Sequence, residues 1–292
     1  MLTRLGLAAT VLAAAMVATT GAVSAAPSRP RIPEVTAVAH RGASAYAPEN
    51  TLAAIDEARA RGARVVELDV QRTRDGVPVL IHDTTLTRTT DVEEVFPGRA
   101  SYRVADFTFA EIRRLDAGSW FDPAYEGERV PTLREGLDRL RRQRLNLLLE
   151  LKEPARYPGL TEEVAETLDE QRWWTGRRGQ GNGHRLVIQS FDHEAVRVSH
   201  DLLPHIPHGV LGKVPVGRIP AYAEWADQIN PNHTTVDAAY VDAVHAEGLE
   251  IYVYTVNDAD TMRATIAKGV DGIISDRPDL LLKVIEEETG AR

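Results

Sequence analysis

Residues 65–83 have the sequence VVELDVQRTRDGVPVLIHD, in which two short apolar runs, 65–70 and 77–82, flank the dipeptide Asp75-Gly76. Both runs are rich in valine, leucine and isoleucine, as strands are. The connection between them is too short for a crossover between parallel strands. Because Asp-Gly is a preferred turn of tight hairpins, we predict an antiparallel hairpin here.

Similar apolar runs recur along the chain and alternate with stretches of helical periodicity, which is the pattern of βα units around a parallel sheet. Three helical stretches, 49–61, 237–247 and 259–268, are each followed by a glycine, as a helix C-cap requires. We therefore predict an α/β protein with a TIM (β/α)8 barrel, to which the hairpin adds a ninth strand. The nine predicted strands are residues 35–40, 65–70, 77–82, 145–151, 186–189, 209–211, 227–230, 251–255 and 272–275.

Residues 84–131, directly after the third strand, show no alternation of strands and helices. We predict that they form a small inserted subdomain over the mouth of the barrel. The segment holds seven of the chain's 17 aromatic residues. Trp120, Phe121 and Tyr125 stand in a loop marked by Gly118, Pro123 and Gly127, and we predict that they form a substrate-binding wall. The alternative is that the aromatic residues pack in the subdomain's own core.

The charge balance and the residue types limit the partners and the chemistry. Lys and Arg number 34 against 43 Asp and Glu, a formal charge of −9, whereas a protein that binds nucleic acid needs a basic face. We therefore expect no nucleic-acid partner. The chain has no cysteine. Disulfides, thiol nucleophiles and thiolate metal sites are thus excluded, and any metal ion must be held by oxygen or imidazole ligands.

The first 25 residues have the three parts of a secretory signal peptide. Arg4 supplies a positive start, residues 5–17 form an apolar core, and Val23-Ser24-Ala25 resembles a cleavage site. We expect cleavage to leave residues 26–292 as a single domain that is secreted, to the periplasm or to the outside of the cell. The alternative is an uncleaved anchor, but the apolar stretch is too short for a stable membrane span.

Polar residues follow several predicted strands where each strand ends, which is where TIM barrels carry their active sites. Glu67 and Asp69 are two residues apart on one strand, so both carboxylates face the same side and together call for a cation. Pairing about the hairpin turn sets residues whose numbers sum to about 150 opposite each other, so His82 comes to their level. His40 and Glu150 end two further strands.

Each of these features alone has a simpler explanation. A Glu-x-Asp strand usually exposes that face to solvent, and a His-Asp pair at the end of a strand commonly forms an Asx turn. Glu150 and Lys152 could form a buried ion pair rather than a metal ligand and an anion-binding group. The coincidence of these features at one end of the barrel favours a functional site.

The chain carries a series of short motifs in a fixed order: His40-Arg41-Gly42, Pro48-Glu49-Asn50-Thr51, Glu67-Leu68-Asp69-Val70, Asp75-Gly76, residues 78–83, Glu150-Leu151-Lys152, Gln189-Ser190-Phe191, Thr255-Val256-Asn257 and residues 272–278. This series resembles the glycerophosphodiester phosphodiesterase family and covers nearly all of residues 26–292. The family fold is a TIM barrel related to the phosphatidylinositol phospholipases C. Its small inserted subdomain follows the His-Asp strand, which corresponds to residues 84–131.

The resemblance implies a metal site and an acid–base pair. Glu67, Asp69 and Glu150 correspond to the ligands of one divalent metal ion, and His40 and His82 to the groups that transfer protons. Three carboxylates without a sulfur ligand favour Ca²⁺ or Mg²⁺ over zinc, and export from the cell favours Ca²⁺. A histidine pKa near 6.5 suits both proton transfers, and which ring donates and which accepts stays open.

The resemblance also implies the substrate. Arg41 and Lys152 would contact the phosphate, and Tyr254, where the family commonly has Trp, would form a wall beside the alcohol group. The implied reaction is hydrolysis of a small molecule, a glycerophosphodiester, to sn-glycerol 3-phosphate and an alcohol. A lysophospholipase D or sphingomyelinase D type of activity is the nearest alternative, because these substrates share the reacting phosphodiester. A metal-dependent sugar isomerase or aldolase barrel and a non-catalytic binding protein are further alternatives.

Overall fold

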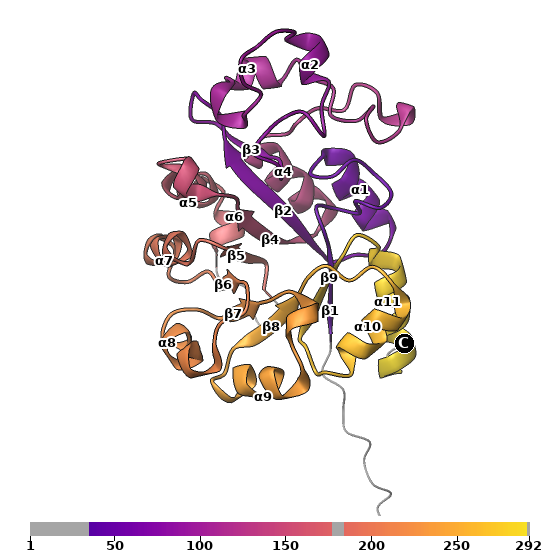
Figure 1. Ribbon diagram of the computed structural model, residues 1–292, viewed down its shortest axis with the longest axis vertical. Coiled ribbons are helices and arrows are strands. Elements are labelled where there is room, and N and C mark those ends of the chain that lie inside the picture. Colours follow the sequence, from indigo (N-terminus) through magenta and orange to yellow (C-terminus); the bar gives the residue numbers. More distant parts are fainter. Residues whose placement is uncertain (1–34, 177–183, 291–292) are drawn as a thin grey trace, which may run out of the picture. The chain divides into compact units, whose positions relative to one another are not determined.

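Eight parallel strands form a closed barrel in a computed structural model that describes residues 35–176 and 184–290. The barrel strands are β1 (Thr36–Ala39), β2 (Val65–Arg72), β4 (Asn146–Leu151), β5 (Leu186–Ser190), β6 (His208–Leu211), β7 (Gln228–Asn230), β8 (Glu250–Val253) and β9 (Gly272–Ser275). They pair in the order β1-β9-β8-β7-β6-β5-β4-β2, and a pairing between β1 and β2 closes the ring (Figure 1). The predicted TIM barrel is therefore confirmed.

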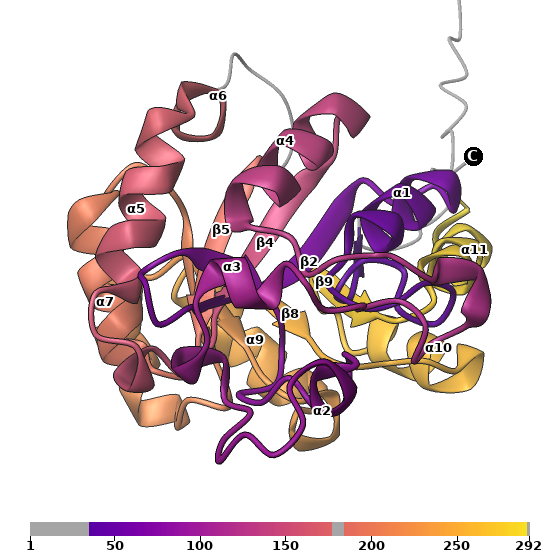
Figure 2. The same ribbon diagram turned by 90° about the horizontal axis from the view of Figure 1, so that it is seen from above.

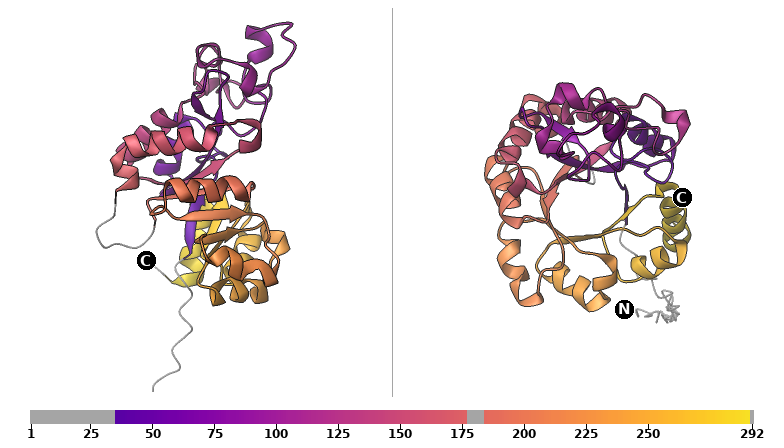
Figure 3. Two further views of the ribbon diagram at one scale, coloured as in Figure 1. Left: turned by 90° about the vertical axis from the view of Figure 1, so that its left-hand side faces the viewer. Right: turned by 45° about the horizontal axis from the view of Figure 1, so that its top comes forward.

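Helices surround the strands (Figure 3). The α-helices of the described residues are α1 (Leu52–Ala60), α2 (Val92–Val95), α3 (Phe109–Ile112), α4 (Leu133–Gln143), α5 (Leu160–Glu170), α6 (Arg172–Thr175), α7 (His193–Leu202), α8 (Ile219–Ala223), α9 (Ala238–Ala246), α10 (Ala259–Ile266) and α11 (Pro278–Thr289). The helix ends predicted from glycines are confirmed, because Gly62, Gly248 and Gly269 have φ of 85°, 77° and 90°. Neighbouring helices such as α5 and α7 pack side by side on the outside (Figure 2).

The strand β3 (Pro78–Leu80) confirms the predicted hairpin, because it pairs antiparallel with β2. Val70 lies opposite Leu80, so the register is the one that the Asp-Gly turn predicts. Leu68 and Val70 pack with the buried leucines of α4 on the outer side of the sheet. Since side chains alternate along a strand, Glu67 and Asp69 point into the barrel.

Residues 84–131 leave the barrel after β3 and contain only short helices, among them α2 and α3 (Figure 1). Together with Val79 and Ile81 they enclose an apolar core that is distinct from the other clusters of the barrel. Phe107 is buried in that core, and Phe96, Tyr102 and Phe109 pack at its edge. Four of the segment's aromatic residues therefore stabilise the segment itself.

The described residues, 35–176 and 184–290, form one compact unit. The predicted signal peptide, residues 1–25, lies outside the described residues, so its cleavage stays a prediction. Among the helices of the described part of the chain, none is long and apolar enough to cross a membrane.

The buried His208 on β6 makes the stability of the barrel depend on pH. Its Nδ1–H donates to the Ile206 carbonyl (2.7 Å), and its Nε2 accepts from the Ser199 hydroxyl (2.9 Å). Burial lowers the pKa of His208 to about 4 from an ordinary 6.5. Between these values the unfolded chain binds a proton that the folded protein does not, so stability falls as the pH falls.

Replacing His208 should therefore flatten this pH dependence. Between pH 7 and pH 5 the wild-type protein is expected to lose about 2 kcal/mol more stability than His208→Gln loses. Urea unfolding of both proteins at the two pH values measures the difference. An equal loss in both proteins would show that another group is responsible.

Candidate active site

A cavity of about 180 Å³ opens at the carboxyl ends of the barrel strands. Its lining residues are His40, Arg41, Glu67, His82, Glu150, Lys152, Gln189, Phe191, Leu211, Tyr254, Thr255 and Ile274. Seven of the residues predicted for the site are among them. An eighth, Asp69, lies beside Glu67 and Glu150. The structure thus brings together side chains from strands at both ends of the sequence.

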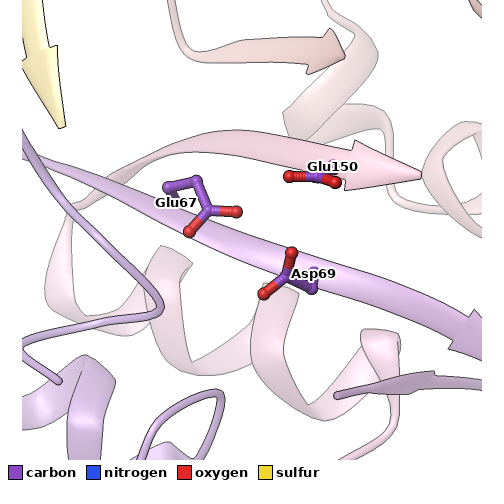
Figure 4. A group of neighbouring side chains, drawn as sticks. All are labelled: Glu67, Asp69 and Glu150. Carbon is purple, nitrogen blue, oxygen red and sulfur yellow. The ribbon is translucent and has the colours of Figure 1, made fainter. Parts of the chain in front are cut away.

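Three carboxylates meet between β2 and β4 (Figure 4). Asp69 and Glu150 are partners in the β2–β4 register, so their side chains lie on the same side of the sheet. Glu67 stands two residues before Asp69 and shares that side. Each of the three side chains contributes one carboxylate oxygen to a group of atoms that all lie within 4.8 Å of one another.

This cluster fits a divalent cation. Each of its three side chains belongs to a residue that is at most 8% exposed, and Glu67 Oε1 is buried without a hydrogen-bond partner among the described residues. Burial and the charges of Asp69 and Glu150 raise the pKa of Glu67 well above its usual range. Burial and the charge of Asp69 also raise the pKa of Glu150, to about 7. Facing oxygen ligands of like charge suit an ion such as Ca²⁺ or Mg²⁺, so these residues could hold one.

Two cationic side chains and one amide contact the cluster from its sides. Lys152 Nζ lies 2.8 Å from Glu150 Oε1 and 3.9 Å from Asp69 Oδ1. Arg41 Nε lies 3.4 Å from Asp69 Oδ2. Asn50 donates from Nδ2 to Asp69 Oδ2 (2.9 Å) and accepts at Oδ1 from the Asp69 backbone N–H (3.0 Å). Burial alone would raise the pKa of Asp69, but the positive charges nearby outweigh it and lower that pKa.

The turn after β1 delivers Arg41 to the cavity. Arg41 has a φ of 51° and Gly42 a φ of 85°. A Cβ on Gly42 would lie 2.5 Å from the Cβ of Ala54, so only glycine fits there. The Arg41 backbone N–H donates to Glu67 Oε2 (2.8 Å), and its guanidinium donates to Glu49 Oε1 (2.9 Å). Arg41 is therefore held both by Glu67 of the carboxylate cluster and by Glu49 outside it.

The ring of His40 is held by an aspartate from the last strand. Because a carboxylate can only accept, His40 Nδ1–H donates to Asp276 Oδ1 at 2.6 Å. Asp276 also accepts from the hydroxyl of Ser44 (2.9 Å) and the amide of Asn257 (2.6 Å). These bonds fix the ring with Nε2 4.0 Å from Glu67 Oε2. Nε2 of His40 thus faces the carboxylate cluster.

His82 has a similar arrangement with its neighbour in sequence. Its Nδ1–H donates to Asp83 Oδ1 (2.7 Å). Gln71 holds the turn that carries both residues, because its Nε2 lies 3.0, 2.7 and 2.8 Å from the carbonyl oxygens of Ile81, His82 and Asp83 and shares its two N–H groups among them. Burial lowers the pKa of His82, although the charge of Asp69 opposes this shift. His82 is therefore neutral at pH 7, with Nε2 able to accept a proton.

An aromatic pair forms one wall of the cavity, where Tyr254 is predicted to lie. The rings of Tyr254 and Phe191 meet edge to face with centres 5.9 Å apart. Lys152 Nζ lies 5.9 Å from the centre of the Phe191 ring. Phe191 is 56% exposed, so the wall opens to solvent. An apolar wall beside a cation suits a substrate with a charged and an uncharged end.

Trp120, Phe121 and Tyr125 are not among the residues that line the cavity. The rings of Trp120 and Phe121 pack edge to face with centres 5.7 Å apart, and Trp120 Nε1–H donates to the Ala117 carbonyl (2.9 Å). The Trp120 ring centre lies 5.8 Å from Cζ of Arg88, a residue that contacts Asp83. Trp120 is 39% exposed. A role for these three residues in a substrate wall stays a prediction.

Several residues of the site were not predicted from the sequence to act there. Asp276, Asn257, Asn50 and Glu49 stand within the quoted motifs, so their positions carried a signal, but only the closed barrel shows what they contact. Asp83 adjoins His82, and an Asx turn is the simpler reading of such a pair. Their shared function is to hold the groups that face the cavity.

The closed barrel carries an acidic cluster, two histidine–aspartate pairs and two cationic side chains at one end. These features define a TIM-barrel enzyme whose site suits an anionic substrate. A model of the glycerophosphoryl diester phosphodiesterase family matches residues 40–280. The chain therefore belongs to this family and is a phosphoric diester hydrolase. The predicted resemblance to the family is confirmed.

Relatives of known name agree with this assignment. A glycerophosphodiester phosphodiesterase of Caldanaerobacter subterraneus is 34% identical over 254 residues, which is 86% of this chain and 97% of the relative. One of Bacillus subtilis is 33% identical over 267 residues, 86% of each protein. Among solved structures, a phosphodiesterase of Oleispira antarctica in complex with the product sn-glycerol-3-phosphate has a TM-score of 0.74 and 30% identity, covering 86% of this chain and 96% of that one.

Proposed function

We propose that the protein hydrolyses glycerophosphodiesters to sn-glycerol 3-phosphate and an alcohol, with one divalent cation and with His40 and His82 as the acid–base pair. One observation carries this proposal. The acidic cluster, both histidines and both cationic side chains converge on one cavity. The product bound to the Oleispira antarctica relative supports the same substrate class.

Glu67, Asp69 and Glu150 would hold the cation, which we propose is Ca²⁺ or Mg²⁺, with Ca²⁺ favoured in an exported enzyme. When bound, it would supply positive charge beside the phosphate oxygens. The three carboxylates supply oxygen ligands only. Lys152 and Arg41 then lie at the edge of the cluster, where each can turn a donor toward an anionic phosphate.

The two histidines divide the proton transfers that a phosphodiester requires. One Nε2 accepts the proton of the nucleophile, and the other ring donates a proton to the departing alcohol, whose alkoxide is a poor leaving group. Asp276 and Asp83 hold the two rings by Nδ1, so that Nε2 is the nitrogen left for each transfer. Each transfer contributes about 10²–10⁴ in rate.

The direct test is product release by the purified protein. Glycerophosphocholine is incubated with protein that has been treated with chelator and then supplied with Ca²⁺, Mg²⁺ or neither, and sn-glycerol 3-phosphate is measured by an enzyme-coupled assay. We expect release only with added metal. Release of choline and lysophosphatidic acid from lysophosphatidylcholine, without sn-glycerol 3-phosphate from glycerophosphocholine, would favour the lysophospholipase D alternative. No release from either substrate would overturn the proposal.

The proposed location follows from the leader segment. We propose that residues 1–25 are removed and that the enzyme is exported, because Arg4, the apolar core and the small residues before Ala26 fit a signal peptide. Sequencing the amino terminus of the protein from the culture fluid or periplasm tests this. Retention of Met1 on protein found only inside the cell would contradict it.

The inserted segment yields a prediction on specificity. Trp120→Ala is expected to change the ratio of kcat/KM between glycerophosphocholine and lysophosphatidylcholine by about tenfold, because a substrate wall acts on one alcohol group more than on another. Metal affinity should stay unchanged. Phe109→Ala, which removes a ring from the segment's own core, is the control for loss of folding. An equal loss on both substrates would return Trp120 to a structural role.

A further inference from the structure

Arg88 does not line the cavity, but it contacts two carboxylates, Asp83 and Glu49, that lie behind residues of the cavity lining. Its Nε and Nη2 donate to the two carboxylate oxygens of Asp83 at 2.6 and 3.0 Å. Its Nη1 and Nη2 donate to the two oxygens of Glu49 at 2.9 and 2.7 Å. Arg88 thus uses its planar fork on two carboxylates at once.

Each of these carboxylates contacts a residue that lines the cavity. Asp83 Oδ1 accepts from both Arg88 and the His82 ring. Glu49 Oε1 accepts from both Arg88 and Arg41. A continuous set of charged hydrogen bonds therefore runs from His82 to Arg41, with Arg88 at its centre. We propose that Arg88 is a positioning residue that holds Asp83 against His82 and Glu49 against Arg41, a role that rests on the proposed function of these two residues.

The fold explains why a link is needed here. Glu49 lies on the loop between β1 and α1, whereas Asp83 follows β3 and directly precedes the inserted segment, residues 84–131. The chain returns after Asp83 so that Arg88 reaches across to that loop. The bonds to Arg88 lower the pKa of Asp83 to about 2, which keeps this carboxylate an acceptor for the His82 ring.

A purely structural role would leave a different signature. Arg88 is 43% exposed, and exposed ion pairs contribute little to folding stability. Removal of Arg88 should therefore affect turnover far more than thermal stability. Arg99 is the matched control, since it lies in the same segment and pairs with Glu111 (2.7 Å) and the Asp106 carbonyl (3.0 Å), away from the cavity.

The kinetic test is a double-mutant cycle on the full-length, metal-loaded enzyme. We expect Arg88→Gln and Asp83→Asn each to lower kcat by about 10–100-fold, and the double variant to fall no more than about twofold below Asp83→Asn. Arg88→Lys should not restore the rate, because a point charge cannot bind two carboxylates in the plane of a fork. Independent losses in the double variant, full rescue by lysine, or an equal loss in Arg99→Gln would overturn the proposal.

A second measurement does not depend on activity. Long-range ¹H–¹⁵N spectra of histidine-labelled protein report which ring nitrogen carries the proton, and His82→Gln identifies the His82 signals. We expect Nδ1–H at His82 in the wild type and in Arg99→Gln, and averaged signals of both tautomers in Arg88→Gln. An unchanged His82 tautomer in Arg88→Gln would overturn the positioning role. A wild type with this tautomer but no release of sn-glycerol 3-phosphate would instead refute the proposed function alone.

Discussion

His82→Ala and His40→Ala are each expected to lower kcat for glycerophosphocholine by about 10²–10⁴-fold. The reason is that each ring presents Nε2 to the cavity while Nδ1 is held by an aspartate. Loss of either ring removes one of the two proton transfers. Metal binding and folding should change little, because neither ring belongs to the carboxylate cluster.

The histidine prediction has a matched control on the opposite side of the barrel. His245 also pairs with an aspartate, Asp271, at 2.8 Å, but Asp271 precedes β9 and so lies at the amino ends of the strands. His245→Ala should keep normal turnover. Steady-state kinetics, with thermal melting of each variant, makes the comparison. Near-normal kcat in His40→Ala or His82→Ala would remove that residue from the acid–base pair.

Glu67→Gln is expected to have opposite effects on function and on stability. Turnover and metal affinity should each fall by at least about 100-fold, because an oxygen site that loses one anion loses much of its field. The metal-free protein should become more stable by about 1–2 kcal/mol, since a buried charge beside two like charges is removed. The raised pKa of Glu67, caused by burial and by Asp69 and Glu150, reports this unfavourable environment.

Thermal melting in chelator and in Ca²⁺ or Mg²⁺ measures both effects. The wild type should gain stability on adding metal, whereas Glu67→Gln should start higher and gain little. Glu163→Gln is the control for the chemical change alone, since Glu163 pairs with Arg72 outside the cavity. A metal-free Glu67→Gln that melts below the wild type, or that metal still stabilises fully, would contradict the three-carboxylate site.

Much of the fold and part of the site could be predicted from the sequence, because interactions between residues close in sequence determine them. The Asp-Gly turn sets the β2–β3 register, because a two-residue turn leaves the flanking strands few ways to pair. The period of two along β2 places Glu67 and Asp69 on one face, opposite the leucine and valine that meet α4. Glycines at the ends of three helices mark where the chain turns back to the barrel. The ordered motifs indicated the family, and the match of its model to residues 40–280 confirms that prediction.

Only the tertiary structure shows which residues support those groups. His40 meets Asp276 because β1 pairs with β9 in the closed barrel, which brings together residues separated by 236 positions. Arg88 reaches Glu49 by a turn in an irregular segment, where no period tells the direction of a side chain. Tyr254 follows a strand, so its position at the cavity could be predicted, and it does line the cavity. Trp120 stands in an irregular segment without such a periodicity, and it lies outside the cavity lining. Sequence determined the chemistry that strand ends carry, whereas barrel closure and loop geometry decided which distant side chains hold that chemistry in place.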